Sequence, residues 1–129
     1  MGGELILIVE DQPLNRKLVR DVLRVQGYRT VEAETGEDGL RAATAEHPDL
    51  ILMDIQLPGI NGIEVLGLLR QNPETCSIPV IAVTASAMQQ NRKEIIQAGF
   101  DGYQAKPINV AAFLDAVRAT LDEWSRKER

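Results

Sequence analysis

The chain has 129 residues, of which 44% are hydrophobic and 26% are charged, and its formal net charge at pH 7 is -5. This length predicts one domain covering residues 1–129, with a core at about 4–122 and a polar tail at 124–129. The acidic balance argues against a nucleic-acid-binding surface, and no apolar run approaches the roughly 20 residues that cross a bilayer, so no membrane contact is expected. A single cysteine, Cys76, allows no internal disulfide and is typical of a cytoplasmic protein.

The chain begins with a buried strand pattern followed by a helix pattern. The apolar run at 4–9 closes on Glu10 and Asp11, and it predicts a strand that is buried on both faces. A helix is expected from Pro13 until Gly27 stops it. Its predicted buried face consists of Leu14, Leu18, Val22 and Val25, with Val19 and Leu23 beside them.

The next segments lead to the central strand. Alternating polar and apolar residues at 28–34 predict a half-exposed edge strand. The segment 35–47 predicts a helix with a capping signal in its first turn. The apolar run at 49–54 then closes on Asp54 and predicts a second strand that is buried on both faces.

The middle of the chain predicts one more helix and one more buried strand. A capping signal at Asn61 opens the helix. The apolar run at 78–84 predicts the strand, which closes on the hydroxyl of Thr84. The predicted buried side of the helix consists of Ile63, Val65, Leu66, Leu68 and Leu69.

The last third of the chain contains its least apolar helix pattern. This helix, at about 88–98, has a small predicted buried set that includes Ile95 and Ile96 and should be the most loosely held. A short strand at 101–105 follows and closes on Lys106. The last helix has its apolar side at Val110, Phe113, Leu114, Val117 and Leu121.

Five strands therefore alternate with five helices. This alternation predicts an α/β fold with a doubly wound parallel sheet and helices on both faces. An edge position for the second strand and central positions for the first and third fit the strand order 2-1-3-4-5. The switch point of that order falls between the first and third strands, where ligands bind in such sheets.

Charged and hydroxyl side chains stand where the predicted strands end. Because parallel strands end at one edge, Glu10, Asp11 and Asp54 should lie together, and they would raise one another's pKa unless a cation neutralised them. Ligands that are all oxygen favour Mg²⁺, or Mn²⁺ as the alternative, over zinc. Thr84 and Lys106 could balance the oxygens of a phosphoryl group. Each residue alone also suits an ordinary role as a cap, turn or surface residue, but chance explains all of them together poorly.

Four segments carry a family resemblance: Ile8-Val9-Glu10-Asp11, Leu52-Met53-Asp54 with Pro58 and Gly62, Val83-Thr84-Ala85, and Lys106-Pro107. With these segments the sequence resembles, over nearly its whole length, a response-regulator receiver domain, the CheY-like module of two-component signalling. It looks most like DivK-type single-domain regulators, and receivers attached to hybrid kinases are also similar.

The resemblance implies a phosphoacceptor, Asp54, and an Mg²⁺ ion held by Glu10, Asp11, Asp54 and the main-chain carbonyl of Gln56. It further implies that Thr84 and Lys106 bind the phosphoryl group. Tyr103 matches the aromatic switch of the family, and Gln56 and Ser86 match positions that tune phosphate lifetime. The implied partners are a histidine kinase or histidine phosphotransfer protein, and a downstream protein. The downstream protein would bind the face made by the helix at 88–98, the strand at 101–105 and the last helix.

Alternatives remain open at this point. A phosphatase with an aspartyl-phosphate intermediate would share the metal and nucleophile, but it would want an acid where Gln56 stands. A flavodoxin-like flavin binder would need a glycine- and hydroxyl-rich loop after the first strand, and two carboxylates stand there instead. The expectation is therefore a signalling phosphoacceptor that is not an enzyme. No output domain follows the last helix, so the chain is expected to be a stand-alone regulator or a receiver of a hybrid kinase that acts as a phosphorelay intermediate.

Overall fold

A computed structural model describes residues 3–84 and 89–128 of the protein. The described chain alternates strictly between strands and helices along its length. The strands are β1 (Leu5–Val9), β2 (Arg29–Ala33), β3 (Leu50–Asp54), β4 (Val80–Thr84) and β5 (Gly102–Ala105). The helices are α1 (Pro13–Val25), α2 (Gly36–Glu46), α3 (Gly62–Gln71), α4 (Gln89–Ala98) and α5 (Val110–Glu128).

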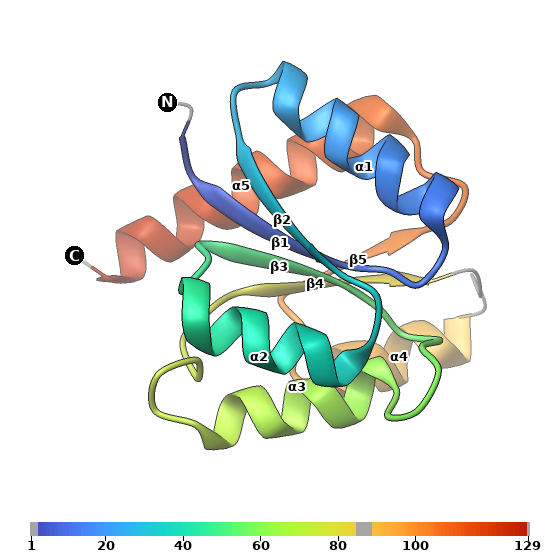
Figure 1. The fold of residues 1–129 in the computed structure, drawn as a ribbon, viewed down its shortest axis with the longest axis vertical. Helices are drawn as coiled ribbons and strands as arrows, with labels where there is room; N and C mark the ends of the chain where they lie inside the picture. Colours follow the sequence, from blue (N-terminus) through green and yellow to red (C-terminus); the bar gives the residue numbers. More distant parts are fainter. Residues whose placement is uncertain (1–2, 85–88, 129) are drawn as a thin grey trace.

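The five strands form one parallel sheet in the order β2-β1-β3-β4-β5, and this confirms the predicted topology. Helices α1 and α5 cover one face of the sheet, and α2, α3 and α4 cover the other (Figure 1). The edge position of β2 agrees with its alternating sequence, because only its last residue, Ala33, is fully buried. The central strand β3 is buried at all five positions.

Alternation along the strands divides the hydrophobic core into two layers, since successive strand residues point to opposite faces. On the face of α1 and α5, strand residues such as Ile8 and Leu52 belong to one buried hydrophobic cluster with Leu23 and Phe113. On the face of α2, α3 and α4, strand residues such as Met53 belong to a second buried cluster, whose helix residues include Val65, Leu66, Leu69 and Ile95.

Helix α1 packs on the sheet with only part of the face that was predicted. Val19 and Leu23 are buried, whereas Leu14 and Val25 are each 82% exposed and Leu18 is 45% exposed. The prediction was right for Val19 and Leu23 and wrong for Leu14, Leu18 and Val25, because α1 has two apolar stripes at helical spacing and the rotation of the helix about its axis buries the shorter one. In the longer stripe Leu14, Leu18 and Val25 face outward, whereas Val22 packs against the core.

Smaller differences occur in α3 and α4. In α3 the predicted core residues Ile63 and Leu68 are 38% and 44% exposed. In α4 Ile95 is buried as predicted, but its neighbour Ile96 is 51% exposed, because adjacent residues of a helix point in different directions. The predicted start of this helix at Met88 lies outside the described residues.

The C-terminal segment is helical where a polar tail was predicted. Helix α5 continues to Glu128, and the indole Nε1 of Trp124 donates a hydrogen bond to the Ser77 carbonyl at 2.6 Å. Polar residues can continue a helix once its apolar turns are packed, and Trp124 attaches this end to the segment before β4. Within residues 3–84 and 89–128, none of the helices is both long and apolar enough to span a lipid bilayer.

Candidate functional site

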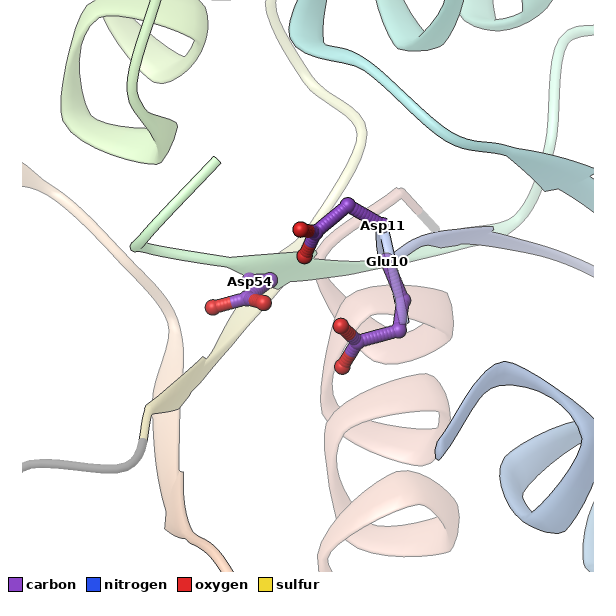
Figure 2. A group of neighbouring side chains, drawn as sticks. All are labelled: Glu10, Asp11 and Asp54. Carbon is purple, nitrogen blue, oxygen red and sulfur yellow. The ribbon is translucent and has the colours of Figure 1, made fainter. Parts of the chain in front are cut away.

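Three carboxylates meet at the carboxyl edge of the sheet. In the register of the central strands Val9 pairs with Met53, so the residues that follow these two lie side by side. Oxygen atoms of Glu10, Asp11 and Asp54 all lie within 4.8 Å of one another. Figure 2 shows the three side chains beside one another at the ends of β1 and β3. The structure therefore brings together the acidic residues that the sequence predicted as a cluster.

Burial and main-chain hydrogen bonds hold two of the three acids in place. Glu10 and Asp54 are each 4% exposed, and Asp11 is partly exposed. The backbone N–H of Gln12 donates to Oε2 of Glu10 at 3.1 Å, and the backbone N–H of Gln56 donates to Oδ1 of Asp54 at 3.0 Å. The second bond orients the Asp54 carboxylate and holds the loop whose Gln56 carbonyl is a predicted metal ligand.

Lys106 supplies a positive charge inside the cluster. Its Nζ lies 2.7 Å from Oε1 of Glu10 and 3.1 Å from Oδ2 of Asp54. Burial raises the pKa of Glu10, and the hydrogen bond from Lys106 only partly opposes this effect. Burial also lowers the pKa of Lys106, but its bond to Glu10 and the charge of Asp54 outweigh that effect and raise this pKa above its ordinary value.

Thr84 and Tyr103 occupy neighbouring strands beside the cluster. Thr84 is 2% exposed at the end of β4, and its carbonyl accepts a hydrogen bond from the Lys106 N–H at 2.8 Å. Tyr103 pairs with Ala82, two residues before Thr84, so the two side chains share the sheet face that α2, α3 and α4 cover. Tyr103 is partly buried against the hydrophobic core of that face. Ser86 lies outside the described residues.

The turn after β3 depends on a glycine. A Cβ atom on Gly62 would lie 2.6 Å from the Asp54 carbonyl oxygen and 2.9 Å from the Ile55 Cα atom. No ordinary side chain fits there, since both contacts are with main-chain atoms. Gly62 thereby allows α3 to begin directly against the main chain of Asp54. On the other side of the site, the Lys106–Pro107 peptide bond is cis.

The donor set fits a hard divalent cation. Within the part of the chain that the structure describes, the clustered ligands are three carboxylates without histidine or thiolate, a set that suits Mg²⁺ or Mn²⁺. The ammonium group of Lys106 already contacts two of these carboxylates and so marks where positive charge is stabilised. Mg²⁺ would be held by Glu10, Asp11 and Asp54.

One contact at the site was not predicted from the sequence. The Arg16 guanidinium donates from Nη1 to the Glu10 carbonyl at 2.9 Å, and its other nitrogens bind Glu32 and Glu34. An arginine in the first turns of a helix is common, and no spacing in the sequence shows that its side chain returns to the preceding turn. The contact becomes visible only when α1 and β2 are placed side by side.

Comparisons with known proteins agree with this architecture. The family model for the response regulator receiver domain matches residues 6–118. A curated relative, the polar-differentiation response regulator DivK of Brucella ovis, is 45% identical over 118 residues, which is 92% of this chain and 96% of that protein.

Solved structures give the same result. The receiver domain of the sensor histidine kinase PA1611 from Pseudomonas aeruginosa, which has a magnesium ion coordinated in its active site cleft, is 34% identical with a TM-score of 0.86. The comparison covers 94% of this chain and 99% of that chain. A CheY-like receiver domain protein from Methanospirillum hungatei is 30% identical with a TM-score of 0.88, covering 98% and 99% of the two chains. This protein therefore belongs to the response regulator receiver domain family of two-component signalling.

Proposed function

We propose that Asp54 accepts a phosphoryl group from a phosphohistidine on a histidine kinase or a histidine phosphotransfer protein. One observation carries the proposal: a lysine ammonium bridges two buried carboxylates, Glu10 and Asp54, with a third carboxylate within 4.8 Å. A buried acid held between a cation-binding cluster and a lysine is suited to receive a group that carries negative charge. The 45% identity with a response regulator supports this role, and a cytoplasmic location is part of the same proposal.

Each residue of the site has a separate role in the proposed phosphoryl transfer. An Asp54 oxygen forms the new bond to phosphorus while the phosphorus–nitrogen bond breaks, and the imidazole leaves with the electron pair. The Gln56 N–H fixes the Asp54 carboxylate at one oxygen, and Lys106 lies at the other, close to where the phosphoryl oxygens would lie. Glu10, Asp11, Asp54 and the Gln56 carbonyl would hold Mg²⁺, or Mn²⁺ in its place. When bound, such an ion would supply positive charge to balance the phosphoryl oxygens.

The outward apolar stripe of α1 supports a docking role for the phosphohistidine donor. Leu14 and Leu18 are exposed one turn apart, and Leu18 also lines a mainly apolar hollow with Lys106, Pro107 and Ile108. A helix that carries a phosphohistidine could place its apolar face on Leu14 and Leu18 with its imidazole near Lys106. The exposure of Leu14 and Leu18 and the hollow beside Lys106 support docking of the donor at this part of α1.

Output is proposed to pass through Thr84 and Tyr103 to the face made by α4, β5 and α5. A phosphoryl group on Asp54 offers Thr84 a charged hydrogen-bond partner, and a movement of Thr84 would change the space available to Tyr103 on the same sheet face. A downstream protein would then recognise the changed face. The second candidate, a phosphorelay intermediate without this change, keeps the same acceptor. In both cases the protein assists its own phosphorylation and is not a turnover enzyme.

Labelling by acetyl phosphate tests the acceptor. Wild type treated with acetyl phosphate and Mg²⁺ should gain one phosphate by mass spectrometry, and mild alkali should remove it, because acyl phosphates hydrolyse readily. Asp54→Asn keeps the shape of the side chain without the nucleophile and should gain none. Equal labelling of Asp54→Asn would contradict the assignment. Continuous hydrolysis of external phosphomonoesters by wild type would favour a phosphatase.

A further inference from the structure

We propose that Arg16 is a positioning residue for the metal-binding carboxylates, and that it acts through the main chain between Glu10 and Asp11. The inference deepens the proposed function and rests on its metal site. Arg16 is in the first turns of α1, and its side chain is only 15% exposed. It touches no oxygen of the carboxylate cluster, and its contact with the site is the Glu10 carbonyl, 2.9 Å from Nη1.

The Glu10–Asp11 peptide is the connection between the two acids. The Glu10 N–H donates to the Ala33 carbonyl of β2 at 3.0 Å, and the Glu10 carbonyl accepts from Arg16. These two bonds fix the main chain on both sides of the Glu10 Cα atom. A peptide unit is planar, so holding its carbonyl also sets the direction of the Asp11 N–H and of the chain at Asp11.

Asp11 depends on this support more than its neighbours do. The Glu10 and Asp54 carboxylates are each held by a backbone N–H and by Lys106. Among the described residues, no group donates a hydrogen bond to the Asp11 carboxylate. Its direction in the metal-free protein is therefore set by the chain that carries it, and Arg16 holds that chain.

The Arg16 guanidinium is itself anchored at two other points. Its Nε donates to Glu32 at 3.2 Å and its Nη2 donates to Glu34 at 3.1 Å, both in or just after the edge strand β2. The planar group thus uses all three nitrogens on fixed acceptors, which a flexible lysine ammonium could not do with the same geometry. From the first turns of α1, Arg16 thus connects the metal-binding turn to β2 and to the residues just after it.

Arg20 provides a matched control on the same helix. It lies one turn further along α1 and also binds Glu32, with 3.5 Å between Nη1 and Oε2. It makes no contact with Glu10. Replacing either arginine by methionine removes one positive charge, keeps most of the apolar stem and removes a contact with β2. Only Arg16→Met also releases the Glu10 carbonyl.

A role for the charge of Arg16 and a role in positioning Asp11 predict opposite changes in the Mg²⁺ affinity of Arg16→Met. If Arg16 acted only through its charge, Arg16→Met would bind Mg²⁺ more tightly, because a nearby positive charge repels the ion. If it positions Asp11, Arg16→Met should bind Mg²⁺ about tenfold more weakly, the loss that is typical when a residue supporting a metal ligand is removed. Arg20→Met should keep or slightly improve the wild-type affinity.

The experiment is an Mg²⁺ titration of wild type, Arg16→Met, Arg20→Met and Asp11→Asn. Binding is measured by calorimetry and by the chemical shift of the residue 11 amide. Thermal unfolding in EDTA should show similar stability for the two methionine variants. The Mg²⁺ concentration for half-maximal acetyl phosphate labelling should rise about tenfold in Arg16→Met, while the rate at saturating Mg²⁺ stays within about twofold of wild type.

An Mg²⁺ affinity of Arg16→Met equal to or above that of Arg20→Met would overturn the inference. If Arg16→Met lacks the folded far-UV spectrum, Arg16→Lys and Arg20→Lys decide by the same comparison, with an expected loss of about threefold for Arg16→Lys alone. Failure of wild type to bind Mg²⁺, or equal binding by Asp11→Asn, would refute the metal site itself and the inference with it. Normal binding by wild type and Arg16→Met together would refute only the role of Arg16.

Discussion

Replacing Asp11 by asparagine should stabilise the metal-free protein and remove its stabilisation by Mg²⁺. The Asp11 carboxylate faces two other carboxylates within 4.8 Å, and Lys106 neutralises one of their charges, so Asp11 meets a net charge of about -1. At about 5 Å this repulsion amounts to about 1 kcal/mol in water and about 3 kcal/mol at an effective dielectric constant of 20. Asp11 is partly exposed, so we expect Asp11→Asn to raise the free energy of unfolding in EDTA by about 1–2 kcal/mol.

Mg²⁺ should stabilise wild type much more than it stabilises Asp11→Asn. At a concentration of 100 Kd, an ion that binds only the folded state stabilises wild type by about 2.7 kcal/mol. Asp11→Asn should gain much less at the same concentration, because one of three charged ligands is lost. The order of stability should therefore reverse, with Asp11→Asn more stable in EDTA and wild type more stable in Mg²⁺.

Thermal and urea unfolding with and without Mg²⁺ measure this reversal. For a chain of this length, 1 kcal/mol corresponds to about 3–5 °C in Tm. Asp115→Asn is the control, because Asp115 is exposed on α5 and the substitution makes the same chemical change away from the cluster. A lower Tm of Asp11→Asn than of wild type in EDTA would refute the repulsion argument. An equal increase in Tm on adding Mg²⁺ to wild type and to Asp11→Asn would refute Asp11 as a ligand.

Further predictions concern the fold around the site and the two faces of the sheet. Gly62→Ala should lower the free energy of unfolding in urea by about 3 kcal/mol or more, because the new Cβ would lie 2.6 and 2.9 Å from main-chain atoms. In the same helix, a Cβ on Gly67 would have nothing within 4 Å, so Gly67→Ala should raise the free energy of unfolding by up to about 1 kcal/mol. Equal effects of the two substitutions would contradict the close approach of α3 to the end of β3. Leu14→Ala should change the free energy of unfolding by less than about 0.5 kcal/mol, whereas Leu23→Ala should lower it by about 2–5 kcal/mol. Leu14→Ala should also slow phosphoryl transfer from a phosphohistidine donor but not from acetyl phosphate. A large stability loss for Leu14→Ala would refute the observed orientation of α1. Beryllofluoride with Mg²⁺ should shift the amide resonances of Tyr103 and α4, and shifts confined to the acidic cluster would favour the phosphorelay intermediate over the switch.

The sheet topology and the acidic cluster could be predicted because they follow from residue order alone. Apolar runs of strand length alternate with helical patterns, and this pattern leaves few topologies. Once the strands are parallel, the residues that end them must meet at one edge, so Glu10, Asp11 and Asp54 could be placed together without coordinates. The capping box of α3, formed by Asn61 and Glu64, is equally local and is present as the spacing predicted.

The features that could not be predicted depend on how elements are rotated and on long side chains that reach across them. The sequence of α1 contains two apolar stripes, and only packing decides that Leu23 faces the core and Leu14 faces outward. The extension of α5 beyond residue 122 depends on Trp124 reaching Ser77, a contact between segments far apart in the chain. The role of Arg16 likewise depends on where α1 lies relative to β2.

Lys106 explains how an acidic cluster of this density can be part of a folded protein without metal. Its ammonium contacts both buried acids, so Glu10 and Asp54 are paired in the metal-free state and the more exposed Asp11 carries the remaining repulsion. A divalent cation adds two positive charges to a cluster with a net charge of about -2, from three carboxylates and one lysine. Binding of such an ion would weaken the attraction between the carboxylates and Lys106, since the carboxylates would then share their charge between two cations. We therefore expect the lysine that balances the acids in the metal-free protein to become available to a phosphoryl group once a metal is bound.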